Sequence, residues 1–256
     1  MRTVVVVPTY DEAGNVVELL RRIRGAVPSA DILLVDDASP DGTAALAEEV
    51  GRELGRIEVL HRPGKAGLGQ AYREGFGRAL AAGYEVVVQM DADLSHDPAA
   101  LPSLLAPLER GRVKMVIGSR YVTGGAIPAW PWHRRALSRF GNRYATAVLG
   151  IEARDITSGY RAYLAPALES LDLRTVRADG YGFMIELAHR AARGGVRMTE
   201  VPITFADRVR GESKMSGRII AEALLLVTWW GARERLAGRR ADRSPVPGAD
   251  RSHPGR

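Results

Sequence analysis

Short apolar runs alternate with longer helical patterns over the first half of the chain. Five runs rich in β-branched residues predict buried strands, at residues 3–7, 31–35, 57–61, 85–90 and 113–119. Helical patterns separate them, and one example is LGQAYREGFGRALAAG, which follows the third run. Strands that are apolar throughout and alternate with helices indicate βαβ units and a mostly parallel sheet covered on both faces. We therefore expect an α/β protein with a Rossmann-like core over residues 1–120.

The pattern changes after Tyr121. The segment VTGGAIPAWPWHRR is rich in Gly, Pro and Trp, which predicts a mobile loop at the mouth of a site. Beyond it, the sequence predicts helices over residues 135–149 and 180–193 and strands over residues 155–164 and 197–208. These elements complete the body of the protein.

The segment IIAEALLLVTWWGA near the C-terminus has more than one interpretation. It is shorter than the ~20 apolar residues that a membrane-spanning helix needs, and Glu222 interrupts it. It fits a core helix, an interfacial helix or a docking site for a membrane protein. The pair Trp229–Trp230 followed by Arg233 and Arg235 is typical of an interfacial anchor, which favours the membrane surface or a membrane partner over the core.

Composition narrows the classes of function. The 256 residues are 46% apolar and 26% charged, the balance of a soluble globular protein. There is no cysteine, which excludes disulfides and thiolate metal sites and agrees with a reducing cytoplasm. Residues 231–256 hold seven arginines against three acidic residues, and so carry +4 of the formal charge of +6. Because the basic character belongs to the tail, it indicates an anionic membrane surface and no nucleic acid.

Acidic residues follow three of the predicted strands, in PTYDE, VDDASPDGT and MDADLSHDP. In a doubly wound sheet the carboxyl ends of the strands form the ligand-binding edge. Asp91 and Asp93 project to the same side of an extended segment, so they can share a hard divalent cation. The sequence therefore predicts Mg²⁺ or Mn²⁺ holding a diphosphate. The alternative is a solvated turn in which Asp97-Pro98 opens the next helix.

Cationic residues follow in several later segments. They are Lys65 in RPGKAGLGQ, Arg120 in GSRY, Arg134 and Arg135 in WHRRALSR, and Arg208, Arg210 and Lys214 in FADRVRGESK. Taken singly, each arginine reads as a solvated surface charge. Taken with the acidic edge, the set predicts two phosphate-bearing ligands, because guanidinium groups match phosphate oxygens.

Seven motifs in this order resemble the signature of the polyprenol-phosphate (dolichol-phosphate) mannosyltransferases: VPTYDE, VDDASPDGT, GKAGLGQAYREGF, MDADLSHDP, VIGSRY, DITSGYRAY and DRVRGESK. These are metal-dependent, inverting family 2 glycosyltransferases with the A-type glycosyltransferase fold. The resemblance extends from about Val6 to Lys214. It implies transfer of mannose from GDP-mannose to a polyprenyl phosphate, which gives a β-mannosyl phosphoryl polyprenol. The enzyme would lie on the cytoplasmic face of the membrane, alone or with a membrane-spanning partner protein.

The resemblance also implies roles for individual residues. With Lys65 added, the donor set is Pro8, Tyr10, Glu12, Val35, Asp37, Lys65, Asp91, Ala92, Asp93, Arg208 and Lys214. Asp91 and Asp93 would hold the metal. Some relatives carry Gln where Ser95 stands, and because a hydroxyl is shorter than that amide, Ser95 would contribute through a water molecule. Arg120, Arg134 and Ser138 would receive the acceptor phosphate, and Arg120 joins the two aspartates as the catalytic set.

These assignments divide the chain into regions. Residues 1–238 would form the catalytic domain, with a nucleotide-sugar half at 1–120, an acceptor half at 121–214 and an amphipathic docking helix at 215–238. Residues 239–256, rich in Arg, Pro and Gly, are predicted to be a disordered basic tail.

The predicted chemistry needs no dedicated base. A phosphate monoester has its second pKa near ~6, so the acceptor is largely dianionic at neutral pH. We therefore expect His96 to support its loop and not to catalyse. UDP-glucose or UDP-GlcNAc as donor is an open alternative, and so is a saccharide acceptor with Asp155 or Asp179 as base. A silent binding subunit is a further alternative, whereas PTYDEAGN in place of a Gly-rich fingerprint argues against a dinucleotide oxidoreductase.

Overall fold

In the computed structural model, which describes residues 1–206 and 223–233, seven strands form one sheet in the order β3-β2-β1-β4-β6-β5-β7. β6 runs antiparallel to both of its neighbours, β4 and β5, and the other four pairs are parallel. The mostly parallel sheet predicted from the apolar runs is confirmed. The strands are β1 (Thr3–Thr9), β2 (Asp31–Asp36), β3 (Ile57–His61), β4 (Val86–Gln89), β5 (Met115–Ser119), β6 (Arg161–Leu164) and β7 (Met198–Pro202).

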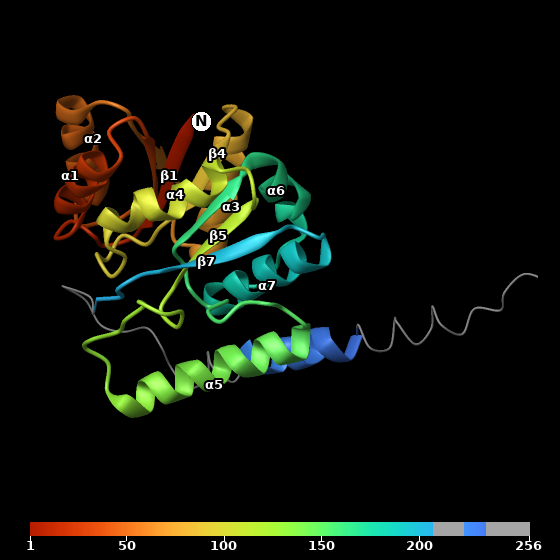
Figure 1. Cartoon of the computed structure of the whole chain (residues 1–256). Helices are drawn as coiled ribbons and strands as arrows, with labels where there is room; N and C mark the ends of the chain where they lie inside the picture. Colours follow the sequence, from red (N-terminus) through yellow and green to blue (C-terminus); the bar gives the residue numbers. More distant parts are fainter. Residues whose placement is uncertain (207–222, 234–256) are drawn as a thin grey trace, which may run out of the picture.

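Helices cover both faces of this sheet (Figure 1). α1 (Val16–Ala26), α2 (Thr43–Leu54) and α4 (Leu101–Glu109) pack on one face, and α4 follows the short 3-10 turn η1 (Pro98–Ala100). α3 (Leu68–Ala81), α6 (Ala165–Ser170) and α7 (Gly180–Arg193) pack on the other, where the turn η2 (Leu173–Thr175) precedes α7.

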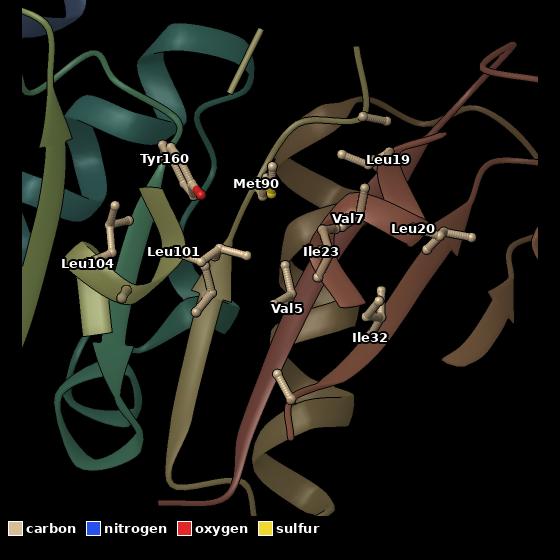
Figure 2. Close-up of a cluster of buried hydrophobic side chains, with 14 of the residues drawn as sticks. Val5, Val7, Leu19, Leu20, Ile23, Ile32, Met90, Leu101, Leu104 and Tyr160 are labelled. Atoms are coloured by element: carbon tan, nitrogen blue, oxygen red, sulfur yellow. The ribbon is translucent and has the colours of Figure 1, made fainter. Parts of the chain in front are cut away.

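Alternation along β1 divides its valines between the two cores. Val5 and Val7 face α1, where Figure 2 shows them with Leu19, Leu20 and Ile23. Val4 and Val6 belong to the opposite cluster, against α3 and α7. All four are buried, as the continuous apolar run predicts for a strand covered on both faces. This packing fixes the carboxyl end of β1 beside those of β2 and β4.

α5 (Trp132–Leu149) and a helix over residues 223–233 lie side by side below the sheet (Figure 1). Val227 is buried against α5 and α7, whereas Leu225 is 72% exposed. One face of this C-terminal helix therefore belongs to the core, and another lies on the surface. α5 begins three residues before the predicted start, and it carries an exposed Trp132 at its first position.

The predicted strand over residues 155–164 is shorter in the structure, because pairing begins at Arg161. Arg161 is fully buried and donates to the carbonyl oxygens of Ile156, Ser158 and Met184. These contacts hold the preceding residues as a loop, which approaches the carboxyl edge of the sheet. The last strand is Met198–Pro202, and the final two residues of the range predicted for it, 207–208, lie outside the described residues.

Several predicted features lie outside the described residues. They are the donor residues Arg208 and Lys214, both ends of the helix predicted at 215–238, and the tail at 239–256. Within the described ranges, none of the helices has the length and apolar character needed to span a bilayer.

Candidate active site

Three turns at the carboxyl ends of β1, β2 and β4 form the acidic edge predicted from the sequence. Each contains one non-glycine residue in the left-handed region, namely Asp11 at φ 59°, Ala38 at φ 56° and Leu94 at φ 61°. Such a conformation costs an L-residue roughly 1–2 kcal/mol, and it persists where the surroundings require it. Strain at all three turns of one edge is a property expected of a functional site.

Asp91, directly after β4, is held on several sides. The Tyr72 hydroxyl of α3 donates to its Oδ1 at 2.8 Å, and its backbone N–H donates to His96 Nδ1 at 3.2 Å. A Cβ on Gly159 would lie 3.2 Å from its Oδ2, so glycine permits the close approach of that loop. The carboxylate is nevertheless 31% exposed, which leaves it open to a ligand.

His96 is buried, and burial lowers its pKa despite the neighbouring carboxylates. Its Nδ1 accepts the Asp91 N–H, which requires the ring proton on Nε2 in the neutral form. The ring stacks on Tyr160 at 4.9 Å between centroids. A neutral, packed imidazole supports the Asp91 loop, which agrees with the role expected from the sequence.

Asp93 is buried and points one carboxylate oxygen back to its own turn. Its Oδ1 accepts from the backbone N–H of Ser95 at 3.1 Å and from the Ser95 hydroxyl at 2.5 Å. Ser95 therefore orients the aspartate, in addition to any contact with a metal through water. Ala92 lies buried between the two aspartates.

This donor set fits a hard divalent cation that is completed by its substrate. Carboxylate oxygens suit Mg²⁺ and Mn²⁺, and Mg²⁺ is usually held by one or two carboxylates together with substrate phosphates and water. Among the described residues, no cluster of three or more His, Cys, Asp or Glu side chains makes a closed protein cage. A pair of aspartates at an open sheet edge suits a metal whose remaining ligands come from water and phosphate.

The predicted donor residues within the described ranges lie around the same edge. Pro8 and Val35 face one another as paired positions of β1 and β2, and both are buried. Lys65 lies 3.8 Å over the ring of Tyr10, which joins the glycine-rich loop to the turn after β1. Glu12 accepts from Asn15 at 2.8 Å at the start of α1.

Asp37 pairs with Arg62, a residue that none of the sequence motifs indicates. The buried Arg62 donates to Asp37 and, at 2.9 Å, to Glu74 of α3. Burial acts to lower the pKa of Arg62, and its two carboxylate partners outweigh this and raise it. Arg62 thus fixes Asp37 in place beside the predicted base and ribose pocket.

The predicted acceptor residues gather around three aromatic rings. The guanidinium carbon of Arg120 lies 5.3 Å from the Tyr121 ring, 5.7 Å from Trp130 and 5.4 Å from Phe205. The guanidinium carbon of Arg134 lies over the Trp130 ring, 4.0 Å from its centroid. Ser138 of α5 accepts from the Tyr121 hydroxyl at 2.6 Å. The structure therefore brings Arg120, Arg134 and Ser138 together.

Shared packing joins the acidic edge to this aromatic cluster. The His96 ring contacts Phe205 at 5.6 Å, and a backbone bridge pairs the same two residues. Phe205 in turn contacts Arg120 and, at 5.7 Å, Trp130. Trp130 is buried, so the end of the segment predicted as a mobile loop is packed into the site. Asp91 and Arg120 are thus separated by two packed rings.

Both candidate bases accept hydrogen bonds in the structure, Asp155 through both carboxylate oxygens and Asp179 through Oδ1 alone. Asp155 forms a two-point ion pair with Arg120, at 2.6 and 2.7 Å. Asp179 caps α7 and accepts from the backbone N–H groups of Gly69 and Gly180. Asp155 lies in the motif DITSGYRAY, but no local pattern in the sequence indicates that it pairs with Arg120, 35 positions earlier.

Comparisons with known proteins identify the family of the chain. Residues 4–172 match the family model described as glycosyl transferase family 2. A polyprenol monophosphomannose synthase of Mycolicibacterium smegmatis is 49% identical over 236 residues, which cover 92% of this chain and 89% of that protein. An undecaprenyl-phosphate mannosyltransferase of Micrococcus luteus is 48% identical over 241 residues, covering 94% and 98%.

Solved structures show the same fold at low identity. A glucosyl-3-phosphoglycerate synthase from Mycobacterium tuberculosis with Mn²⁺, UDP and glucosyl-3-phosphoglycerate matches with a TM-score of 0.64 at 20% identity, covering 96% of this chain and 82% of that one. A mannosyltransferase from Pyrobaculum calidifontis with GDP-Man and Mn²⁺ matches with a TM-score of 0.54 at 17% identity, covering 96% and 76%. The fold is the A-type glycosyltransferase fold, and the chain belongs to glycosyl transferase family 2.

Proposed function

We propose that this protein transfers mannose from GDP-mannose to a polyprenyl phosphate. The names of the two close relatives, a polyprenol monophosphomannose synthase and an undecaprenyl-phosphate mannosyltransferase, support the sugar and the acceptor class. The guanine nucleotide draws support from the resemblance and from the Pyrobaculum mannosyltransferase that binds GDP-Man. UDP-glucose or UDP-GlcNAc remains the alternative donor.

The buried ion pair of Asp155 with Arg120 supports the choice of acceptor. A saccharide hydroxyl needs a base within hydrogen-bond reach. Asp155 is buried and held at both oxygens by Arg120, whereas the exposed Asp179 uses its Oδ1 to cap α7. A phosphate monoester is already an oxyanion at neutral pH, so it needs only positioning and desolvation. Arg120, Arg134 and Ser138 supply cationic and hydroxyl groups for that purpose at one aromatic cluster.

On the donor side, Asp91 and Asp93 are proposed to hold Mg²⁺ or Mn²⁺ together with the diphosphate. The cation, when bound, neutralises charge that develops on the departing nucleotide. Tyr72 and Ser95 orient the two carboxylates, and Pro8, Tyr10, Glu12, Val35, Asp37 and Ala92 would receive the nucleoside and sugar. Arg208 and Lys214, outside the described residues, are proposed to clamp the diphosphate.

The proposed reaction inverts the anomeric carbon. The acceptor oxygen attacks that carbon from the side opposite the bond to the diphosphate, so an α-linked donor gives a β-linked product. Arg120 and Arg134 orient the acceptor oxygen for this attack, and the packed rings of Trp130 and Phe205 exclude water from it.

Contact with a membrane surface is proposed for the layer formed by α5 and the helix over residues 223–233. Trp132 is 75% exposed, and Phe140 and Trp229 are exposed as well. α5 also carries Arg135 and Arg139 on exposed positions, which suits anionic lipid headgroups. The arrangement supports peripheral contact with a membrane surface. That this surface is the cytoplasmic face, reached alone or with a membrane-spanning partner, is proposed from the resemblance.

A donor-by-acceptor assay tests the proposal. Purified protein with Mg²⁺ or Mn²⁺ is given radiolabelled GDP-mannose, UDP-glucose or UDP-GlcNAc, each with a polyprenyl phosphate, a polyprenol or a free sugar. We expect label in the lipid fraction only with GDP-mannose and the phosphate, and a β-configured product by NMR. Transfer to polyprenol or to a free sugar would contradict the acceptor, and preference for a UDP-sugar would contradict the donor.

A further inference from the structure

The guanidinium of Arg120 is fixed from one edge. Its Nε donates to Asp155 Oδ2 at 2.7 Å and its Nη2 to Asp155 Oδ1 at 2.6 Å, while its own backbone N–H donates to Oδ2 at 2.9 Å. Both side chains are buried, at 4% exposure for Arg120 and 0% for Asp155. Burial acts to lower the pKa of Arg120, and the Asp155 carboxylate outweighs it and raises the pKa. The arginine is therefore a permanent cation held in one orientation.

The other end of the guanidinium, Nη1, keeps its hydrogen-bonding capacity with respect to the described residues. Within the described part of the chain, Nη1 of Arg120 makes no hydrogen bond to protein, whereas Nε and Nη2 are both used. The rings of Tyr121, Trp130 and Phe205 surround the same group at 5.3 to 5.7 Å. Nη1 is therefore the donor that the described residues leave for an anion, and the Asp155 pair sets the direction in which it points.

Thr157 connects this ion pair to α5. Its hydroxyl accepts from Arg120 Nη2 at 2.8 Å and from Asn142 Nδ2 at 3.0 Å. Asn142 is buried on α5, accepts from the Thr157 N–H at 3.2 Å and donates to the carbonyl of Ser138 at 3.0 Å. The same side chains thus set the position of Arg120 on the sheet edge and of Ser138 on the helix.

Glu200 of β7 holds the backbone of the loop that contains Asp155. The carboxylate of Glu200 accepts from the backbone N–H groups of Arg154 at 2.8 Å and of Asp155 at 2.9 Å. Asp155 is therefore held at its own backbone while its side chain holds Arg120. Such outer contacts determine how accurately a binding group is placed, because an error of about 1 Å is costly in a polar site.

We propose that Asp155 and Thr157 are positioning residues, which aim the free end of Arg120 at an acceptor phosphate and tie it to Ser138 through Asn142. This inference rests on the proposed function, because the anion is taken to be a prenyl phosphate. The ion pair does more than stabilise the fold: it creates a cationic group with one open end. Asp155 itself makes no contact with substrate and takes no proton.

Two buried arginine–aspartate pairs permit a matched comparison. Asp155→Asn weakens the Arg120 pair on the acceptor side, and Asp37→Asn weakens the Arg62 pair on the donor side. We expect Asp155→Asn to raise the KM for polyprenyl phosphate at least ~10-fold, with the KM for GDP-mannose changed less than ~2-fold, because a hydrogen bond to a charged group is lost. Asp37→Asn should show the reverse pattern. Equal changes in both KM values for Asp155→Asn would overturn the inference.

Thr157 provides a second test that leaves the charges intact. Thr157→Val removes the hydroxyl and should raise the acceptor KM roughly 3- to 10-fold, and Thr157→Ser should restore it. A Thr157→Ser protein as impaired as Thr157→Val would indicate packing and not the hydroxyl, and would overturn the role of Thr157.

Binding of a short prenyl phosphate separates this inference from the proposed function. Citronellyl phosphate, followed by ³¹P NMR without donor, should bind the wild type and the Asp37→Asn protein alike and the Asp155→Asn protein at least ~10-fold more weakly. A wild type that binds it but transfers no mannose would refute the proposed function, and the binding ratio would still decide the role of Asp155. Equal binding by wild type and Asp155→Asn overturns the positioning role.

Discussion

The hydroxyl of Tyr72 gives the sharpest test of the proposed metal site. It donates to Asp91 Oδ1 at 2.8 Å, while the ring stacks on Phe183 at 6.0 Å and packs on Phe76 at 5.4 Å. Tyr72→Phe removes the hydroxyl and keeps those ring contacts. Burial, followed by the Asp91 charge, raises the pKa of Tyr72 well above its usual value, so the group is a neutral donor at all ordinary pH values.

The expected magnitude follows from the exposure of Asp91. Removing a hydrogen-bond partner of a metal-binding carboxylate typically weakens metal binding ~10- to 100-fold. Because the Asp91 side chain is 31% exposed, water replaces part of the lost bond, and we expect the lower end, about 10-fold. The free energy of unfolding should change by less than ~1 kcal/mol, since the Asp91 oxygen that loses its partner belongs to a carboxylate that water can reach.

Tyr163→Phe is the matched control. Its hydroxyl donates to Gln89 Oε1 at 3.0 Å, and both residues are fully buried. Loss of this bond leaves an amide oxygen unsatisfied, which costs ~1–3 kcal/mol of stability, but it does not touch either aspartate. Manganese titrations by EPR in the presence of GDP, with urea unfolding of the same proteins, separate the two effects. Unchanged Mn²⁺ affinity in Tyr72→Phe, or equal losses in both variants, would refute the reasoning.

Three further predictions concern the same edge and the lower helix layer. Burial lowers the folded-state pKa of His96 below its unfolded value of ~6.5. The unfolding free energy of metal-free protein should therefore be greatest above about pH 6.5 and fall as the pH drops. A His96→Gln protein whose unfolding free energy falls just as steeply between about pH 7 and pH 5 would contradict this. Gly159→Ala should weaken binding of GDP with Mn²⁺ in calorimetry, because its Cβ would lie 3.2 Å from Asp91 Oδ2; unchanged affinity would count against it. Gly231→Ala should lower the urea unfolding free energy by ~1–3 kcal/mol, because a Cβ there overlaps Val148 of α5, whereas Gly77→Ala, with open space around it, should not; equal stability of the two variants would disprove the contact.

The sequence was sufficient for the strands of the first half and for the acidic edge. Continuous apolar runs place β1, β2 and β4 in a covered parallel sheet, and their carboxyl ends then meet by topology. The antiparallel direction of β6 was not predicted, because alternation along a strand reports burial and not the direction of its neighbours.

The partners of the site residues could not be read from the sequence. Arg62 pairs with Asp37 across 25 residues, and Arg120 with Asp155 across 35, so neither pair leaves a local pattern. Tyr72 reads as one apolar position of an amphipathic helix, and its hydroxyl gains a role only because α3 passes the end of β4. Burial of Trp130 likewise depends on Phe205, which is distant in the sequence.

The place of β6 in the sheet has a consequence for synthesis on the ribosome. In the sheet, β6 lies between β4 and β5, since β4 borders β1 and β6, and β5 borders β6 and β7. A nascent chain of 120 residues therefore contains β4 and β5 but lacks the strand that joins them. Until residues 161–164 emerge, the flank of Val86, Val87 and Val88 is an unprotected edge of the kind that pairs with other chains. Fragments that stop short of β6 should therefore aggregate, and maturation should be completed late.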